Sequence, residues 1–431
     1  MRGSIAIFAL CATFLSACGG DTDDGLDDTA LRAQVRVVQA VVDAPALDVY
    51  VLASARLPAF PNLASGSATG YVGLDTGNYQ FIVRQPGDPD ILAQLDVGLD
   101  ISARTLLIVS GARTPGPGEQ PISIKAFDDA RVDPPPGKTQ LRIVNATVEG
   151  ESFPIGVADQ ALVSPPANEE VLTTVDAGVP VQITADAKAF TTPPLPPATD
   201  VTIVVIGSRG SDDGDVRALR LLNVPAVGIS NTTPATTIAQ NPFAVFVNGV
   251  PGGAGLLTID GVDQPTLLFS GVSPRVQVSS NPSIRLDGEP ATLGGALDPA
   301  TTYLVVIAPN TAAGGITLFA YRDTLADSAE TRIRAINATI GSGSRDIALS
   351  PAPVLGSDLV VGAASPSSGT LIADPAAVTA ITATPLVGAP FVYTTGIPAT
   401  SRYVVLVGNT ATTFGAVVIS ADWSATFVAA D

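Results

Sequence analysis

Short apolar runs separated by turn residues make up most of the chain, and no long stretch keeps a 3.6-residue period. The runs are rich in Val, Ile and Thr, and 41 Gly and 36 Pro lie in and between them. This pattern is typical of strands joined by tight connections. Leu47, Val49 and Val51 alternate with Asp48 and Tyr50, which predicts a strand with one face in water. The sequence therefore predicts an all-β protein.

Three strand motifs recur in the same order four times, at a spacing of about 100 residues. The first motif reads VRVVQA (35–40), LRIVNA (141–146), FAVFVNG (243–249) and IRAINA (333–338). The second motif reads TLLIVSG (105–111), VTIVVIG (201–207), TYLVVIA (302–308) and RYVVLVG (402–408). The third motif reads ISIKAFDD (122–129), VRALRLLN (216–223), ITLFAYRD (316–323) and GAVVISAD (415–422). The order and spacing predict four copies of one domain.

The second motif is a continuous apolar run, which predicts a central strand buried on both faces. The repeat is too long for a solenoid or a propeller blade and has the size of an immunoglobulin-like sandwich. Arg36, Arg142 and Arg334 occupy matching places in the first motif, and the third copy has no Arg there. We therefore expect four tandem immunoglobulin-like β-sandwich domains, which span residues 34–130, 139–224, 242–323 and 331–424.

The first residues have the pattern of an export signal. Arg2 is followed by an apolar run over residues 5–14, which is too short to span a bilayer. The run leads into Leu15-Ser16-Ala17-Cys18, which resembles the lipobox of bacterial lipoproteins. The resemblance implies that residues 1–17 are a signal peptide and that Cys18 carries the lipid. The alternative is an ordinary secreted protein that is cleaved near Ala17.

Residues 18–33 read as a flexible tether behind the lipidated cysteine. The segment contains GGDTDDGLDD (19–28), which is too acidic and polar to form a core. Part of it is similar to a calcium loop, but Arg32 stands where that loop needs its closing Glu. Gly19 directly after the cysteine, by the sorting rule of such lipoproteins, implies the outer membrane.

Composition excludes several classes of function. The net charge of −18, with 22 Lys and Arg, argues against nucleic acid as a partner. The chain has no His, and Cys11 leaves with the signal, so the mature body has no thiol beyond the lipidated Cys18. Ser-His-Asp catalysis, Cys-His catalysis and zinc sites are therefore excluded. Carboxylate chemistry, such as glycoside hydrolysis, and binding of hard cations remain.

A family resemblance covers residues 34–129. VRVVQAVVDAPALDVYV (35–51) resembles the opening signature of the bacterial "domain of unknown function 4397" family, and TLLIVSG (105–111) resembles a later strand of it. The other three copies keep the strands but lack the Asp-Ala-Pro-Ala turn of residues 43–46. The resemblance implies an exported β-domain that often occurs in tandem, and it supplies no catalytic residue.

Several acidic residues are candidate ligands, each with a structural alternative. Asp43 and Asp48 flank a proline turn, and either they bind a cation or Asp43 caps the turn and Asp48 faces solvent. The loop SDDGD (211–215) is either a calcium loop or an exposed hairpin tip. A polar residue that ends the third motif is either a repeated ligand or a cap on backbone groups. These residues are Asp129, Asn223, Asp323 and Asp422.

Asn145 and Asn337 open glycosylation sequons, which carry little meaning in a bacterial lipoprotein. No residue is assigned a catalytic, metal-binding or cofactor-binding role, and no cofactor is expected. The expected function is a non-enzymatic structural, adhesion or presentation role in the cell envelope. Its expected partners are the membrane, through the lipid on Cys18, and envelope proteins or polysaccharide. The alternatives are ligand or glycan binding for uptake and, third, a carboxylate-based glycoside hydrolase.

Overall fold

The computed structural model describes residues 32–52, 57–130, 133–158, 160–162, 165–166, 168–209, 211, 217–225, 235–310, 315–325, 330–339, 343–351, 353–385, 389–408 and 414–429. Within these residues the secondary structure consists of strands and one 3₁₀ turn, η2 (Pro375–Ala377). The prediction of an all-β protein is therefore confirmed. No helix in this part of the chain is long and apolar enough to cross a membrane.

The first half of the chain forms two groups of strands. Unit 1 contains β1 (Ala33–Gln39), β2 (Leu47–Val51), β3 (Phe60–Leu63), β4 (Ser67–Ala68), β5 (Val72–Leu74), β6 (Gly77–Arg84), β7 (Ala93–Leu99), β8 (Arg104–Ser110) and β9 (Ser123–Asp128). Unit 2 contains β10 (Lys138–Thr147), β11 (Ile155–Val157), β12 (Gln160–Leu162), β13 (Glu170–Asp176), β14 (Gln182–Ala185), β15 (Lys188–Thr191), β16 (Asp200–Gly207), β17 (Arg220–Pro225) and β18 (Thr236–Ile238).

The second half repeats this arrangement. Unit 3 contains β19 (Phe243–Asn248), β20 (Leu257–Ile259), β21 (Val262–Asp263), β22 (Val276–Gln277), β23 (Ile284–Leu286), β24 (Glu289–Ala291), β25 (Thr302–Asn310) and β26 (Gly315–Arg322). Unit 4 contains β27 (Arg332–Asn337), β28 (Arg345–Ser350), β29 (Val354–Leu359), β30 (Thr370–Leu371), β31 (Ala380–Pro385), β32 (Phe391–Thr394), β33 (Ser401–Val407), β34 (Gly415–Ser420) and β35 (Ala425–Ala429). β18 and β35 lie outside the domain ranges expected from the sequence.

Each unit has the same two sheets. The three motifs form an inner sheet, in which the first strand runs parallel to the second and the third strand pairs antiparallel, as in β1, β8 and β9. Two hairpins form an outer sheet, with the order β3-β2-β6-β7 in unit 1. The β-sandwich prediction is therefore confirmed. The immunoglobulin-like part is not confirmed, because β1 and β2 lie in opposite sheets, whereas the first two strands of a constant-type immunoglobulin domain are neighbours.

The inner sheet is buried on both faces, which explains the continuous apolar runs of the second motif. In β8, Leu107 and Val109 pack against the outer sheet of unit 1. The alternate residues Leu106 and Ile108 pack against β10, β16 and β17 of unit 2. Successive side chains of a strand point to opposite faces, so a strand covered on both sides needs apolar residues throughout.

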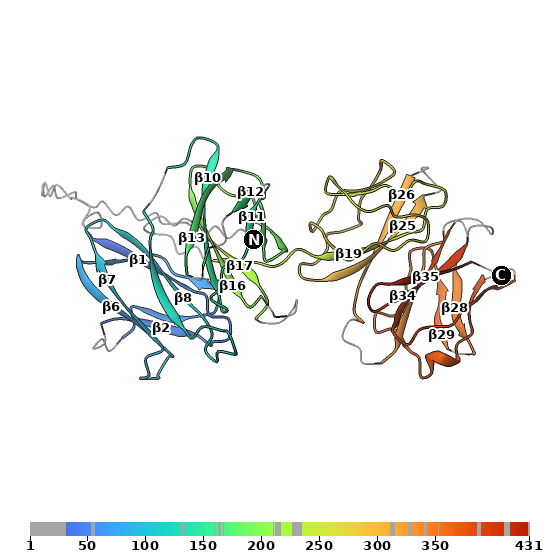
Figure 1. Cartoon of the computed structure of the whole chain (residues 1–431), viewed down its shortest axis with the longest axis horizontal. Coiled ribbons are helices and arrows are strands. Elements are labelled where there is room, and N and C mark those ends of the chain that lie inside the picture. Colours follow the sequence, from blue (N-terminus) through green and yellow to red (C-terminus); the bar gives the residue numbers. More distant parts are fainter. Residues whose placement is uncertain are drawn as a thin grey trace, which may run out of the picture.

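One face of each inner sheet packs against the outer sheet of its own unit, and the other face packs against the inner sheet of a neighbouring unit. Units 1 and 2 share one hydrophobic core, and units 3 and 4 share another. Each pair is thus a four-layer double sandwich, which we call the first lobe and the second lobe. Figure 1 shows the blue-to-green lobe and the yellow-to-red lobe, joined by a thin connection before β19. The equivalent faces meet in each pair, as in the self-complementary contact of a two-fold dimer.

A buried amide lies at the end of the opening strand in units 1, 3 and 4, and two residues before its end in unit 2. The side chain of this residue accepts a hydrogen bond from the backbone N–H two residues later; the four residues are Gln39, Asn145, Asn248 and Asn337. Asn145 and Asn337 are fully buried, and their amide groups also donate to backbone carbonyls. The two sequon asparagines are therefore structural, and the sequence analysis missed this recurring role.

Candidate functional site

A cluster of buried charges in the first lobe lies around Asp129, directly after β9. Arg36 of β1 donates to Asp129 Oδ2 at 2.6 Å, and the two side chains are only 3% and 8% exposed. The hydroxyl of Tyr71 donates to the same oxygen at 2.5 Å. Arg142 of unit 2 lies 3.5 Å from Asp129 Oδ1 and pairs with Glu170 at 3.2 Å. Asp129 therefore joins the two units of the lobe through charge.

The second lobe has an equivalent cluster around Asp323, directly after β26. Tyr403 of unit 4 donates to Asp323 Oδ1 at 2.7 Å, and Arg402 lies 3.4 Å from Oδ2. The Asp323 side chain is 2% exposed. Burial and the charge of Asp323 raise the pKa of Tyr403, and burial and the charge of Asp129 raise that of Tyr71. Both tyrosines therefore act as neutral hydrogen-bond donors at physiological pH.

The strand register separates the four polar residues that end the third motif. Asp129 and Asp323 occupy equivalent places, since their N–H groups donate to the carbonyls of Arg104 and Thr302, the first residues of β8 and β25. Asn223 lies inside β17, paired with β16 and β18. Asp422 lies in the turn before β35, where its carboxylate accepts the Ser424 N–H at 3.0 Å. The hypothesis of one fourfold ligand position is therefore wrong.

The register also shifts the second motif of unit 3 by one residue. The parallel pairing places Ile307 beside Asn248, as it places Val109 beside Gln39. The place of Gly111 is therefore taken by Pro309, and the alignment that ended this motif at Ala308 is wrong.

The two acids of the proline turn have structural roles. Asp43 accepts the N–H groups of Arg113 and Thr114, at 2.9 and 3.3 Å, and so holds the loop after β8. Asp48 is buried and accepts the Asn62 N–H at 2.7 Å, so the expectation that it faces solvent is wrong. Among the described residues, no group of three or more acidic or thiol side chains could hold a metal ion.

Some of the residues singled out from the sequence lie outside the described part of the chain. These are Cys18 with the signal peptide, the tether up to residue 31, and residues 212–215 of the SDDGD loop. Conversely, the sequence analysis missed Tyr71, Arg402 and Tyr403. Of these three residues, only Arg402 could have been singled out from the sequence, because it is a charged residue next to an apolar run. Nothing in the linear pattern connects either tyrosine with its aspartate.

A second ion pair joins units 1 and 2 at the other end of their inner sheets. Arg217 of unit 2 donates to Glu119 of unit 1 at 2.6 Å, and the two side chains are 26% and 13% exposed. The hydrogen bond from Arg217 holds the pKa of Glu119 below its ordinary value of 4.5. This pair therefore makes the first lobe sensitive to acid.

Replacing Glu119 with Gln should weaken the acid sensitivity of the first lobe. The folded-state pKa of Glu119 lies below the unfolded-state value, so its contribution is present above pH 4.5 and is lost as pH falls through the folded-state pKa. The measurement is urea unfolding of wild type and Glu119→Gln between pH 7 and pH 3. Glu119→Gln should show the smaller fall in unfolding free energy. Equal falls for the two proteins would contradict the assignment.

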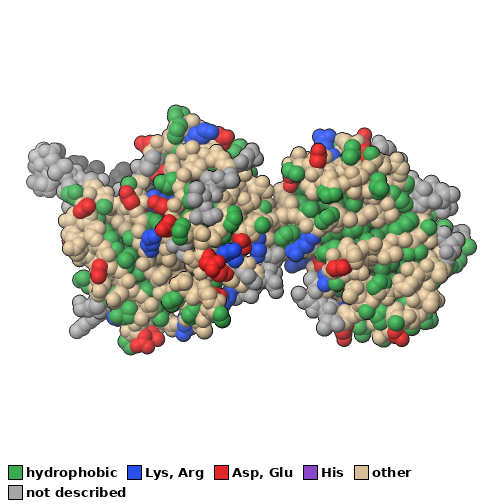
Figure 2. All heavy atoms as spheres, viewed as in Figure 1, with side chains coloured by type: hydrophobic (Ala, Val, Ile, Leu, Met, Phe, Trp, Pro, Cys, Tyr) green, Lys and Arg blue, Asp and Glu red, His purple; other side chains and the backbone are tan. Residues whose placement is uncertain are grey.

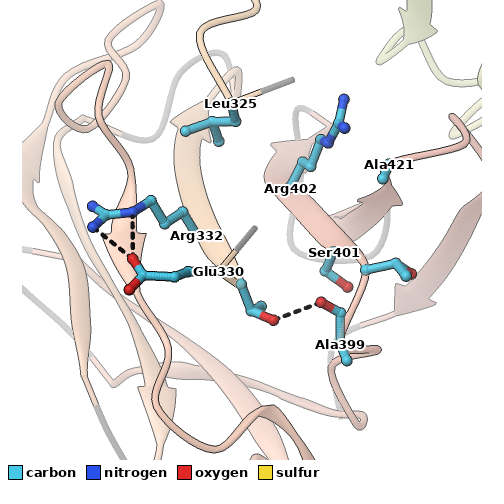
Figure 3. Close-up of a pocket in the computed structure, with 9 residues that line it drawn as sticks. Leu325, Glu330, Arg332, Ala399, Ser401, Arg402 and Ala421 are labelled. Carbon is cyan, nitrogen blue, oxygen red and sulfur yellow. Dashed lines mark hydrogen bonds and ion pairs between the residues drawn. The ribbon is translucent and has the colours of Figure 1, made fainter. Parts of the chain in front are cut away.

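Two open pockets lie in the second lobe. The first, of about 200 Å³, lies where the connection between units 3 and 4 meets the start of β33. Figure 3 shows Glu330 and Arg332 paired on one side and Ala399, Ser401 and Arg402 on the other. Glu330 is the one carboxylate among its described lining residues, whereas glycoside hydrolysis needs two. The second pocket, of about 330 Å³, lies along β26.

Comparison with known families covers the first unit of this architecture. Residues 33–153 match the family model of a domain of unknown function, DUF4397. The DUF4397 match confirms the resemblance seen in the sequence. The matched residues span all of unit 1 and continue through β10 of unit 2. One face of β10 packs against β1 and β8 in the hydrophobic core that units 1 and 2 share. No curated protein matches the chain.

Proposed function

We propose that this chain is a lipid-anchored, non-enzymatic protein of the bacterial envelope with a structural, adhesion or presentation role, which presents its loops and strand edges to partners. The lipid on Cys18 and the tether between Cys18 and β1 would hold the body at the membrane, with the outer membrane as the expected location. Envelope proteins or polysaccharide are the proposed partners.

The observation that carries this proposal is that the buried ion pairs join neighbouring units to each other. Asp129 and Asp323 are the most buried carboxylates that form ion pairs in the described chain, and each pairs with an Arg of the neighbouring unit. Their tyrosine partners are neutral donors held in place by the same contacts. Charges arranged in this way fix one unit against the next, which suits a spacer or presentation module.

Ligand binding for uptake is the second candidate, and the pockets of the second lobe favour it. The larger pocket, of about 330 Å³, reaches the lower end of the range for small-molecule sites. The smaller one, of about 200 Å³, lies below that range. Both pockets are open, so they would bury less of a small ligand than an uptake site usually does.

Binding assays with the purified full-length protein separate the two functions. One assay measures retention on isolated peptidoglycan and surface polysaccharide, to which the lipid on Cys18 does not bind the protein; the other measures thermal shifts with a panel of sugars and metabolites. If the protein has a structural or adhesion role, one of the macromolecular fractions should retain it. A thermal shift from a small molecule, with no retention on any fraction, would favour uptake and contradict the proposal.

A further inference from the structure

The third strand of each inner sheet has an outer edge, which pairs with a further strand in two of the four units. In units 2 and 4, β17 and β34 are each covered by a further antiparallel strand, β18 or β35, which we call the fifth strand. In units 1 and 3, β9 and β26 are the last strands of their sheets. The chain passes from them directly to the next opening strand, β10 or β27. Among the described residues, no strand therefore pairs with the equivalent edge in units 1 and 3.

The backbone of β26 presents free hydrogen-bonding groups along this edge. Asp323 donates to the carbonyl of Thr302 opposite it, so the alternate residues Leu318 and Ala320 direct their N–H and C=O groups away from β25. No other group in the described chain bonds these outward N–H and C=O groups. β26 is also long and uncharged from Gly315 to Tyr321, a sequence that does not protect an edge.

A groove follows the open edge of β26. Its lining residues are Leu293–Leu297, Tyr303, Leu318–Tyr321 and Gly362, and none of them is charged. Leu293 and Leu297 belong to the core on one face of β26, whereas Tyr321 donates to the Gly362 carbonyl on the other face. The groove is therefore continuous with the interface between units 3 and 4. Figure 2 shows hydrophobic side chains gathered in a band across this lobe.

The fifth strands of the same chain indicate what fits such an edge. The residues equivalent to Ala320 are Asn223 and Val418, since each pairs with the same residue of the second motif, and they pair with Thr236 and Thr426 of the fifth strands. Two residues later, the fifth strands have Ile238 and Val428. Both strands thus read Thr-x-Ile or Thr-x-Val in the same register, without charge.

We propose that the open edge of β26 binds an extended segment of a partner protein as an antiparallel fifth strand, with an uncharged Thr-x-Val or Thr-x-Ile core. The groove favours a single strand over a second copy of this chain. A second β26 would bring its own Leu293–Leu297 loop and Gly362 against those of the first. The proposal does not depend on how or where the protein is anchored.

β9 supplies a matched control because its edge is open but protected. Ala126 is equivalent to Ala320, since Ala126 pairs with Leu107 as Ala320 pairs with Val305. Lys125 and Asp128 place charges on β9, which is how natural edges resist pairing. A proline at either alanine removes an outward N–H and leaves the ladder to the neighbouring strand intact.

The test measures binding of a fluorescein-labelled peptide with the sequence of Ser424–Ala429 to purified full-length protein, by fluorescence anisotropy. Wild type and Ala126→Pro should bind alike, and Ala320→Pro should bind at least about tenfold more weakly. N-methylation of the peptide at the positions of Thr426 and Val428 should abolish binding, because these N–H groups face β34 in the native pair. N-methylation at the position of Phe427 should not.

Hydrogen exchange of the residues of β26 should slow on peptide binding to wild type, and not in Ala320→Pro. Equal binding by wild type and Ala320→Pro, no binding by either, or an equal loss in both proline variants would overturn the proposal. A concentration-dependent dimer that Ala320→Pro alone abolishes would assign the groove to a second copy and would also overturn it.

Discussion

Replacing Cys18 with alanine should move the protein from the membrane fraction to the soluble fraction. In the proposed function, the lipid on Cys18 is the membrane anchor. Each buried CH₂ of an acyl chain contributes about 0.8 kcal/mol, so several chains on one cysteine give an affinity that does not reverse on the time scale of fractionation. The body offers no substitute through charge, because a net charge of −18 is repelled by anionic lipids.

Cys11→Ala is the matched control, since Cys11 is the only other cysteine and lies in the expected signal peptide. Immunoblots of membrane and soluble fractions should show Cys11→Ala with the membranes and Cys18→Ala in the soluble fraction. Retention of Cys18→Ala in salt-washed membranes would show that another contact anchors the protein.

Replacing Asp129 with alanine should lower the free energy of unfolding of the first lobe by about 3–5 kcal/mol, the usual cost of breaking a buried ion pair by removing one partner. Arg36 is 3% exposed, and Asp129 is its ion-pair partner at 2.6 Å. The change would also remove the hydrogen-bond acceptor of Tyr71 and the contact with Arg142. Differential scanning calorimetry should show one of two transitions shifted to lower temperature.

Asp176→Ala is the control for this change, because Asp176 pairs with Lys138 at the same distance of 2.6 Å but at the surface, where the side chains are 73% and 43% exposed. Its expected cost is below about 1 kcal/mol. Asp323→Ala should shift the other calorimetric transition, which assigns each transition to a lobe. If Asp129→Ala and Asp176→Ala shift the transition equally, the buried cluster does not hold units 1 and 2 together.

Much of the fold could be predicted from the sequence because strand patterns are local. The alternation in residues 47–51 predicts β2, and the runs at 105–111 and 201–207 predict β8 and β16. The inner sheets were recognisable as buried on both faces for the same reason. The covering layer could not be predicted, because a pattern of burial does not say which distant segment buries a face.

The candidate sites were less predictable because they depend on register. Counting along the third motif placed Asp129, Asn223, Asp323 and Asp422 together, but strand pairing sets Asn223 within β17 and Asp422 in a turn. Asp48 looked solvent-facing in an alternating strand, but it is buried and accepts the N–H of Asn62 in the neighbouring strand β3. A carboxylate's partners come from segments that are close only after folding.

The sequence by itself determined the all-β class, the three recurring motifs and the need of the second motif for cover on both faces, since these follow from local patterns of apolar and polar residues. Only the tertiary structure decided that units 1 and 2, and units 3 and 4, cover each other. It also decided that the edge of β26 stays open while those of β17 and β34 are filled. The first outcome depends on packing between distant segments, and the second depends on whether a fifth strand follows the third motif. Neither can be derived from the local sequence pattern of a single repeat.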